Sequence, residues 1–582
     1  MINVYDFEVF SNDWLVVIMN LQSQTKTVIV NDTDELTNYY NSHEDELWVG
    51  YNNSRYDQYI MKAILCGFDP YAVSNYIIQE GGDGWRYSEL FNQFPFVNYD
   101  VMLRNDSGLK SLEGFMGNDI YESSVPFNIA RKLHVDEINE TIKYCTHDVE
   151  QTIEVFTQRI AEFNAKMALM KIFNLPIEYL SKTNAQIVAK ICGGRGLKFN
   201  ENEFDFPIVD TLRLGKYLSI KNWYRNPINH DYSKSQTVDV AGVKHIFAWG
   251  GIHGALPKYY GEGVYIMADV TAYYPSLQKR YKFGYRNMAF PDNFEKIHDE
   301  NLRQKQLGNK KARLPYKIAD NSISGQLKDR NSSLYDPLDN NAICVNGQLL
   351  LLDLIEKLES HIEQFVQSNT DGILFKIHSI SDYEKIDDIV WEWEQRTGMR
   401  MEFDIYSKVY QKDVNNYLLV TPNGKTKTKG AYTKSLGALD YDLPIVNKAM
   451  VNYMVDGTPI EKTIGDCDDL IMFQKIVKLK GSYDYVEHNK IRYDFKCYRV
   501  FASTNYLDGQ ILKCKTNVGG SDKKDKFANT PDHCFIQNGD VKKLKVPAHL
   551  NKDWYINLAK DRLRQFGVME NIYEQRRFDF GE

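Results

Sequence analysis

The sequence lacks paired cysteines, long apolar runs and an excess of basic residues. No C-x-x-C pair occurs among its 8 cysteines, so we expect reduced thiols and exclude a zinc module built on paired cysteines. No apolar run approaches the roughly 18 residues that a membrane-spanning helix needs. The opening MINVYDFEVF lacks the basic stretch and apolar core of a signal peptide. We therefore expect a cytoplasmic protein with no membrane partner.

The balance of charge excludes a further class of protein. The 582 residues include 70 Lys and Arg against 78 Asp and Glu, which gives a net charge of −8 at pH 7. Such a chain does not coat nucleic acid through an overall positive charge. An enzyme with carboxylate-rich metal sites and local basic stripes remains compatible with this balance. The length indicates several domains with ample core.

One stretch, residues 263–276, has the clearest chemical signal and reads GVYIMADVTAYYPS. Residues 264–270 form a short apolar run that is typical of a strand, and Asp269 stands near its end. Tyrosines, a proline and a serine follow, which predicts the start of a helix. A carboxylate at the end of a core strand is costly to bury unless a cation or a donor meets it. An ordinary turn aspartate beside a helix start would fit the same residues.

The N-terminal region contains further carboxylates in patterns that suit a metal site. In NVYDFEVF, alternation places Asp6 and Glu8 on one strand face, where like charges repel unless they share a cation. In WVGYNNSRYDQYI, Asp57 follows a strand and opens a helix. In IKYCTHDVEQTIEVF, Tyr144 and Asp148 lie four residues apart and share a helical face. Taken singly, a helix cap and a solvent-facing acid explain Asp57 and Asp148 as well.

Together and in this order, these patterns resemble the D-x-E, N-x2-(F/Y)-D and Y-x3-D motifs of the DEDDy 3′–5′ exonucleases, which have an RNase H-like α/β domain. The resemblance implies two Mg²⁺ ions astride a phosphodiester, one that activates water and one that stabilises the leaving oxygen. Tyr144 would orient the attacking water. The implied metal ligands are Asp6, Glu8, Asp57 and Asp148.

The same resemblance implies contacts to single-stranded DNA. Asn53 and Tyr56, from the second motif, would position the terminal nucleotides. Between the second and third motifs, KSLEGF resembles the S/T-L-x2-hydrophobic element that holds the single-stranded end in B-type polymerases. Its residues here are Ser111, Leu112 and Phe115.

The middle of the chain resembles the palm of family B DNA polymerases. DVTAYYPSL, from Asp269, resembles the first palm motif, D-x2-S-L-Y-P-S. FVQSNTDGILFKI reads as two strands around a turn that needs no function as a bare hairpin. In this position it resembles Y-x-D-T-D-S, with Asp371 as the last aspartate and Asn369 in place of the first. The resemblance implies that Asp269, Asp371 and the Val270 carbonyl hold two Mg²⁺ ions, with Mn²⁺ able to substitute.

The incoming nucleotide would meet residues on both sides of this motif. Tyr274 would pack under the sugar and exclude a ribose 2′-OH. The segment from Lys317 to Gly325 resembles K-x3-N-S-x-Y-G, with Ser324 in place of the tyrosine. Lys305 and Lys317 would then suit a triphosphate from one shared helical face, and Asn321 would line the nucleotide pocket. A solvated basic helix face is the neutral alternative.

Two further segments are predicted to contact duplex DNA. In HIFAWGGIHG, Gly250 and Gly251 resemble the Y-x-G-G/A loop that grips template, with Ala248 at the position of the tyrosine. The K-x-Y primer motif would fall at Asn415-x-Tyr417, where only the tyrosine matches. A hairpin signal follows, with lysines and no acid from 421 to 435, which suits phosphate contacts. Its lysines are Lys425, Lys427, Lys429 and Lys434.

The predicted fold is an α/β and α+β multidomain chain, an RNase H-like exonuclease domain followed by a palm–fingers–thumb polymerase. The predicted boundaries are 1–160 for the exonuclease, 161–245 for a helical connector and palm entry, 246–290 and 330–410 for the palm, 291–329 for the fingers, and 411–582 for the thumb and C-terminal region.

These resemblances predict a template-directed DNA polymerase of phage-type replication that adds dNTPs to a primer 3′-OH and proofreads with its exonuclease. The expected partners of this monomer are primer-template DNA, dNTPs and a processivity factor, since residues 575–580 resemble a sliding-clamp peptide. A frayed polar end is the alternative for that tail. If the chain is phage-encoded, its compartment is the host cytoplasm. Two rival functions stay open, an exonuclease with a degenerate palm and a non-catalytic factor that binds primer-template.

Overall fold

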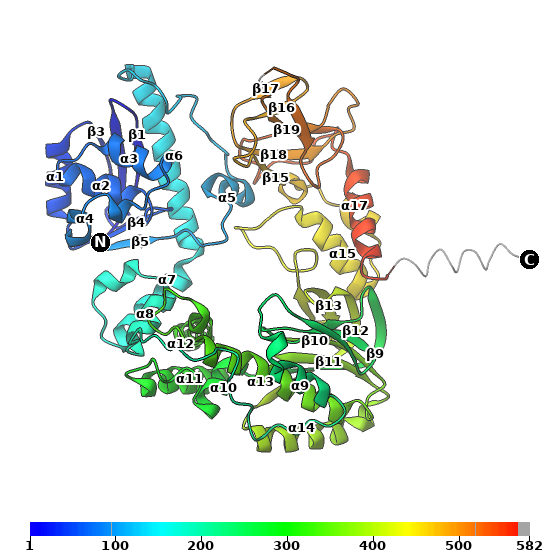
Figure 1. Cartoon of the computed structure of the whole chain (residues 1–582). Coiled ribbons are helices and arrows are strands. Elements are labelled where there is room, and N and C mark those ends of the chain that lie inside the picture. The colour runs from blue at the N-terminus through cyan, green and yellow to red at the C-terminus, as the bar shows by residue number, and fades with distance from the viewer. Residues whose placement is uncertain (95, 518, 569–582) are drawn as a thin grey trace, which may run out of the picture. The chain divides into compact units, whose positions relative to one another are not determined.

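The computed structural model describes residues 1–94, 96–517 and 519–568. They form two compact units, which combine helices with several sheets (Figure 1). The predicted multidomain chain of mixed α and β structure is therefore confirmed. The tail at 575–580 lies outside the described residues. The first unit comprises Met1–Thr183, Leu436–Ile445 and Asp466–Tyr555, and the second comprises Asn184–Ser435, Val446–Gly465 and the residues from Ile556 onward.

The first unit opens with a five-stranded sheet in the order β3-β2-β1-β4-β5. The first three strands are antiparallel neighbours, whereas β4 runs parallel to β1 and β5 parallel to β4. Alternation along β1 buries one face against helices that contribute Leu36, Ile60 and Val73 to a common core. The strands are β1 (Ile2–Val9), β2 (Trp14–Asn20), β3 (Lys26–Val30), β4 (Leu47–Gly50) and β5 (Asn98–Asp100).

Helices surround this sheet and continue beyond it. The longest, α6, starts with a capping box in which the Glu137 carboxylate accepts from the His134 backbone N–H at 2.8 Å. The helices of this region are α1 (Thr33–Ser42), α2 (Asp57–Leu65), α3 (Pro70–Ile78), η1 (Gly84–Arg86), α4 (Leu90–Gln93), α5 (Leu109–Met116), α6 (Val135–Gln158), α7 (Ile160–Ile172) and η2 (Ile177–Ser181).

Residues 466–555 of the first unit add two small antiparallel sheets, with the orders β15-β18-β21 and β17-β16-β19-β20. Val486, Tyr498 and Ile511 are buried in a core that both sheets share. The elements are η6 (Leu470–Phe473), β15 (Lys475–Lys478), β16 (Tyr485–His488), β17 (Ile491–Tyr493), β18 (Cys497–Ala502), β19 (Ile511–Lys515), β20 (Lys523–Lys526) and β21 (Cys534–Ile536).

A nine-stranded sheet organises the second unit, in the order β14-β13-β12-β9-β11-β10-β8-β7-β6. Its longest central pair is β9 with β12, and β9 also pairs antiparallel with β11. The strands are β6 (Gln236–Val240), β7 (Val243–Phe247), β8 (His253–Ala255), β9 (Tyr259–Val270), β10 (Gln364–Asn369), β11 (Gly372–Ile377), β12 (Met401–Asp413), β13 (Asn416–Val420) and β14 (Thr426–Lys429).

The helices of the second unit include the long α13, on which Leu350, Leu354 and Leu358 form a buried stripe. Two further helices, α15 (Pro444–Asp456) and α17 (Lys552–Arg564), run from residues of the first unit into residues of the second. The others are α8 (Asn184–Ile191), α9 (Leu218–Arg225), η3 (Pro227–Asn229), α10 (Tyr273–Tyr281), α11 (Pro291–Gln306), α12 (Lys310–Ser324), η4 (Gly325–Lys328), α13 (Pro337–Leu358), η5 (Ile380–Asp382), α14 (Tyr383–Thr397) and α16 (Ile460–Gly465).

The prediction that Lys305 and Lys317 share one helical face is wrong. Lys305 belongs to the last turn of α11 and Lys317 to α12, and the two helices pack against each other as a hairpin. Gly308 between them has a φ of +67°, a left-handed conformation that ends α11 and that glycine adopts without strain.

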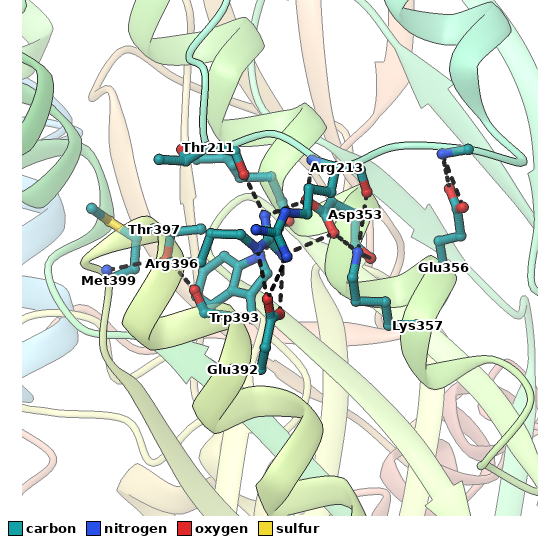
Figure 2. A network of polar contacts seen from close by, with 12 residues as sticks. Thr211, Arg213, Asp353, Glu356, Lys357, Glu392, Trp393, Arg396, Thr397 and Met399 are labelled. Atoms are coloured by element: carbon teal, nitrogen blue, oxygen red, sulfur yellow. Dashed lines mark hydrogen bonds and ion pairs between the residues drawn. The ribbon is translucent and has the colours of Figure 1, made fainter.

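A buried ionic network fixes α13 and α14 to the segment that precedes α9 (Figure 2). The Asp353 carboxylate is 0% exposed. It accepts from the Arg396 guanidinium at 2.9 Å and from the Arg213 backbone N–H at 2.7 Å, and it also contacts Lys357. Trp393 packs into the same region and donates to the Leu350 carbonyl at 2.9 Å. The network therefore joins three segments of the second unit through one carboxylate.

Two expectations from composition can be compared with the structure. All 8 cysteines are free thiols. Among the residues that the structure describes, no helix is long and apolar enough to cross a membrane.

Replacing Asp353 with Ala should destabilise the second unit by about 3–5 kcal/mol, because it leaves the Arg396 guanidinium, which is only 8% exposed, without its buried anion. Denaturant unfolding followed by tryptophan fluorescence measures this loss. Glu392→Gln is the matched control, since Glu392 is 43% exposed in its ion pair with Arg396 and should change stability by less than about 1 kcal/mol. Equal effects of both substitutions would contradict the assigned role of Asp353.

Candidate active sites

The first candidate site lies at the end of the five-stranded sheet, where four carboxylates approach one another. β1 carries Asp6 and Glu8, Asp57 is the first residue of α2, and Asp148 lies on α6. Phe7 of β1 donates its backbone N–H to the Asp57 carboxylate at 3.1 Å, which joins α2 to the strand. The structure therefore brings together the four residues that the sequence predicted as metal ligands.

Burial and mutual repulsion both act on these four groups. Burial, followed by the charges of neighbouring carboxylates, raises the pKa values of Asp6 and Glu8 well above their usual range. Burial likewise raises the pKa of Asp57 to about 7 and that of Asp148 to about 6. Clustered buried carboxylates are unfavourable in their ionised form unless a cation joins them. This arrangement fits a site for divalent cations.

Additional groups around this centre could also hold a cation. Ligand atoms of Asp6, Glu8 and Cys145 lie within 4.8 Å of one another, as do those of Glu113, His147 and Asp148. The carboxylate oxygens suit Mg²⁺ or Mn²⁺, whereas the thiol of Cys145 is a softer ligand. Cys145 donates instead to the backbone carbonyl of Asp6 at 3.2 Å.

A lysine that the sequence reasoning missed supplies positive charge to this centre. The Lys110 ammonium, at the start of α5, contacts the Asp148 carboxylate and donates to Glu113 at 3.0 Å. It also lies 4.6 Å from the centre of the Tyr144 ring. Burial disfavours the charged form of Lys110, but Asp148 and Glu113 outweigh it and raise its pKa. The one available signal was its place directly before Ser111 in KSLEGF.

The residues predicted to hold single-stranded DNA are largely in the interior. Asn53 is 0% exposed and donates to Asn98 at 2.7 Å, whereas the Tyr56 hydroxyl lies 2.8 Å from that of Ser74. Ser111 and Leu112 are buried on α5, and Phe115 packs against Ile120, Ile476 and Cys497. Their contact with DNA stays a prediction.

The second candidate site lies where β9 meets the β10–β11 hairpin. Asp269 is opposite Gly372 in the register of β9 and β11, so Asp371 in the turn lies beside it. The Val270 backbone N–H donates to the Asp371 carbonyl at 2.7 Å. A Cβ at position 372 would lie 2.0 Å from the Asp269 carboxylate. Glycine at this position therefore permits the close approach of the two acids.

The turns that carry these acids adopt uncommon backbone conformations. Thr370, immediately before Asp371, has a φ of +54°, and Ala272, three residues after Asp269, has a φ of +45°. Left-handed conformations are unfavourable for residues with a Cβ and above all for a β-branched one. Strain of this kind persists where surrounding structure enforces it and is frequent at functional sites.

Lysines and further acids surround Asp269 and Asp371. Lys427 of β14 places its ammonium 2.7 Å from the Asp269 carboxylate and 3.5 Å from that of Asp404. Burial raises the pKa of Asp371, and the negative charge of Asp269 raises it further. Glu402 lies opposite Asp269 in the β9–β12 register. Two adjacent carboxylates with oxygen donors around them fit a hard divalent cation.

The predicted nucleotide-binding residues lie on three helices near this end of the sheet. Lys305 of α11 donates to Glu402 at 2.5 Å, so α11 is linked to the strand beside Asp269. Lys317 and Asn321 are one turn apart and exposed on α12. Tyr274 of α10 packs close to Gly347 of α13, where a Cβ would be 3.5 Å from its ring. Their roles toward a nucleotide stay predictions.

The glycine loop is built directly against the Asp371 turn. The Thr370 backbone N–H donates to the Ile252 carbonyl at 2.9 Å, and a Cβ at Gly251 would lie 2.8 Å from the Thr370 hydroxyl. Buried Gln348 of α13 donates to the Gly250 carbonyl at 2.6 Å. Trp249 is enclosed by aromatic rings, among them Phe204 at 4.6 Å. The loop thus supports the strained turn, and its contact with a template stays a prediction.

The remaining predicted DNA contacts differ in exposure. Tyr417 of β13 is buried in the core of the sheet with Tyr265 and Met267. Lys425 is exposed in the β13–β14 turn. The charge of Lys429 favours the ionised form of Asp371, so this lysine also faces the second centre.

No protein-family model matches the chain, and no curated protein matches it. Among solved structures, a family B DNA polymerase from the hyperthermophilic archaeon Pyrobaculum calidifontis is similar at 12% identity and a TM-score of 0.41. The match covers 98% of this chain and 78% of that chain. A likeness of this size does not establish a shared fold, so the inference of function rests on the residues and their geometry.

Replacing Asp57 with Asn should stabilise the metal-free protein at high pH. The raised pKa of Asp57, about 7, means that the folded state retains a proton that the unfolded state has lost, so stability falls as pH rises from about 4 to 7. At about pH 8 in EDTA, the variant should be more stable by up to about 4 kcal/mol. At about pH 4 the gain should vanish, because Asp57 is then protonated in the folded protein and is as neutral as the asparagine that replaces it.

Thermal unfolding at both pH values measures this difference. Asp34→Asn, an exposed acid in the first turn of α1, is the control and should behave like the unsubstituted protein. A gain in stability of the same size at both pH values would show that burial does not raise the pKa of Asp57.

Proposed function

We propose that the chain is a template-directed DNA polymerase with a 3′–5′ exonuclease, as the family B resemblance of its motifs implies. The observation that carries this proposal is the position of Asp269 beside Asp371, on a strand end and a hairpin turn, together with a separate four-carboxylate centre in the other unit. A protein that only binds primer-template has no use for two such centres.

In the polymerase half, Asp269, Asp371 and the Val270 carbonyl would hold the divalent cations. Two Mg²⁺ ions in such a site activate a primer 3′-OH and stabilise the pyrophosphate that leaves. Tyr274 would exclude a ribose 2′-OH by its position after the strand end. Lys305, Lys317 and Asn321 would contact the dNTP from α11 and α12, which we assign as the fingers.

In the exonuclease half, the sheet order β3-β2-β1-β4-β5 with three antiparallel and two parallel strands supports an RNase H-like assignment. The carboxylates of Asp6, Glu8, Asp57 and Asp148 would hold the cations. Tyr144 would orient water toward the terminal phosphodiester. Lys110 adds a cation that can meet the negative charge of the phosphate or of the leaving group.

The domain boundaries predicted from the sequence belong to this proposal. Residues 1–160 would be the exonuclease, 161–245 the connector, 246–290 with 330–410 the palm, and 291–329 the fingers. Residues 411–582 would be the thumb and C-terminal region, although the structure divides their described part between both units. Primer-template DNA and dNTPs would be the partners.

One observation favours the rival reading of an exonuclease with a degenerate palm. Asn369 replaces an aspartate of the family motif, and its amide donates to the Val414 carbonyl at 3.2 Å. The site therefore has one acidic charge fewer than the motif that it resembles. We favour the polymerase because the two acids assigned to the cations are both present.

Primer extension with Mg²⁺ tests both halves in one reaction series. A labelled primer-template is incubated with dNTPs, with NTPs or without nucleotide. We expect extension with dNTPs and shortening without nucleotide. Asp269→Asn should lose extension by at least about 100-fold and keep shortening, and Asp57→Asn should do the opposite, because each removes a ligand from one centre.

The controls are Asp388→Asn on α14 and Asp34→Asn on α1, two exposed acids that should leave both reactions unchanged. If the primer is shortened but is not extended with any nucleotide, the result would contradict the polymerase and support an exonuclease with a degenerate palm. If neither reaction occurs but the protein still binds primer-template, the result would support the non-catalytic factor.

A further inference from the structure

Helix α5, which carries Lys110 into the first carboxylate centre, is held along its whole length by residues 466–555. At its N-terminal end, the Lys478 ammonium of β15 contacts the Ser107 carbonyl. In the first turn, the Cys497 thiol of β18 lies 3.5 Å from the Lys110 carbonyl. Beyond its C-terminal end, the Val541 backbone N–H donates to the Gly117 carbonyl at 3.0 Å.

The segment after α5 is joined to the same residues. The Ile120 backbone N–H donates to the Asn538 carbonyl at 2.8 Å. The Glu122 carboxylate accepts from the backbone N–H groups of Lys496 and Cys497 at 2.9 and 2.8 Å. Backbone-level contacts of this number fix the position of α5 against β15 and β18 rather than leave a loose surface contact.

Arg499 is the centre of this attachment. Its side chain is 0% exposed. One terminal nitrogen donates to the carbonyls of Gly114 and Asn118 at 3.2 and 2.7 Å, at the end of α5, and the other donates to Gly539 at 2.6 Å. Its Nε donates to Gln474 at 3.0 Å.

A buried guanidinium of this kind is unusual because, among the described residues, no carboxylate lies within ion-pairing distance of it. Burial lowers the pKa of Arg499 to about 10, which leaves it charged at neutral pH. Carbonyl groups at the C-terminal end of a helix carry partial negative charge, so a cation there is favoured. Arg499 therefore binds α5 through the carbonyl end of the helix, and a neutral side chain could not replace all of these bonds.

The orientation of α5 decides where Lys110 and Glu113 lie, because both project from this helix onto the carboxylate centre. Lys110 reaches Asp148, a metal ligand in the proposed exonuclease. A shift of α5 by one or two ångströms would break this contact, since hydrogen-bonded ion pairs are short-ranged. Residues 466–555 thus determine the charge balance of a centre that lies more than three hundred positions earlier in the sequence.

We propose that residues 466–555 are a positioning module of the exonuclease centre and that Arg499 is its key positioning residue, acting through α5 and Lys110. This inference rests on the proposed function where it concerns nuclease activity. It removes these residues from the thumb, to which sequence position alone assigned them. Arg499 is 0% exposed and would act only through the residues that it contacts.

The test compares Arg499→Met with Arg499→Lys and with Arg492→Met, an exposed arginine of β17 paired with Asp494. Exonuclease kcat and KM are measured on a single-stranded oligonucleotide, and primer extension in the same samples reports on the second unit. We expect Arg499→Met to lower the nuclease kcat at least about tenfold with extension within about twofold of normal. Arg499→Lys should restore part of the loss, and Arg492→Met should change neither reaction.

A second measurement does not depend on nuclease activity. Lys110 competes with divalent cations for Asp148, so Lys110→Met should tighten Mn²⁺ binding at the Asp57-dependent site by about tenfold. If Arg499 acts through Lys110, Arg499→Met should do the same, and the double variant should equal Lys110→Met alone. Additive effects, or an unchanged Mn²⁺ affinity in Arg499→Met, would overturn the proposal.

These outcomes distinguish a failure of the proposed exonuclease activity from a failure of the positioning role of Arg499. A protein without nuclease activity but with the expected Mn²⁺ pattern would overturn the proposed exonuclease and retain the positioning role. If Arg499→Met does not fold, Lys478→Met decides, because Lys478 is exposed and holds only the N-terminal end of α5. It should lower the nuclease kcat about threefold and tighten Mn²⁺ binding, and no change in either would refute the inference.

Discussion

Repulsion between closely spaced carboxylates is the constraint on which both candidate centres depend. Four acids in the first unit and two adjacent acids in the second are held close together, where the negative charge of each acid makes its neighbours costlier to ionise. In each centre a lysine from a distant part of the chain lies on one of the acids, Lys110 of α5 on Asp148 and Lys427 of β14 on Asp269. A lysine offers one charge and no coordination geometry, so it balances such a centre only in part. Divalent cations would complete the balance, and an arrangement completed in this way would suit phosphoryl chemistry.

Holding like charges together requires a rigid surrounding structure, and each unit provides one. In the second unit, the glycine loop and Gln348 support the left-handed Thr370 next to Asp371, and the buried Asp353 network joins the helices α13 and α14. In the first unit, Arg499 and its neighbours hold α5 at both ends. Asp353 and Arg499 are buried and hydrogen-bonded within these supports, so their removal is costly in the way that breaking a buried network is.

Local patterns in the sequence predicted local structure well. The strand with Asp6 and Glu8, the helix with Tyr144 and Asp148, and the hairpin around Asp371 are all present, because alternation, helical spacing and turn chemistry act over a few residues. Contacts between distant segments were not predictable in this way. Apart from its place directly before Ser111 in KSLEGF, nothing near Lys110 indicates its contact with Asp148. No local pattern in residues 466–555 indicates that they pack on α5. The expected common face of Lys305 and Lys317 was wrong because Gly308 ends a helix between them, and a glycine is a helix stop signal that the sequence itself contains.

The central claim is that one chain contains a working polymerase centre and a working exonuclease centre. A primer with a mismatched 3′ nucleotide, supplied with template, Mg²⁺ and all four dNTPs, tests this claim most directly when the extended products are sequenced. The account predicts full-length products in which the mismatch has been replaced by the correct nucleotide, and retention of the mismatch in Asp57→Asn. Products that keep the mismatch in the unsubstituted protein, or no extended product at all, would contradict it.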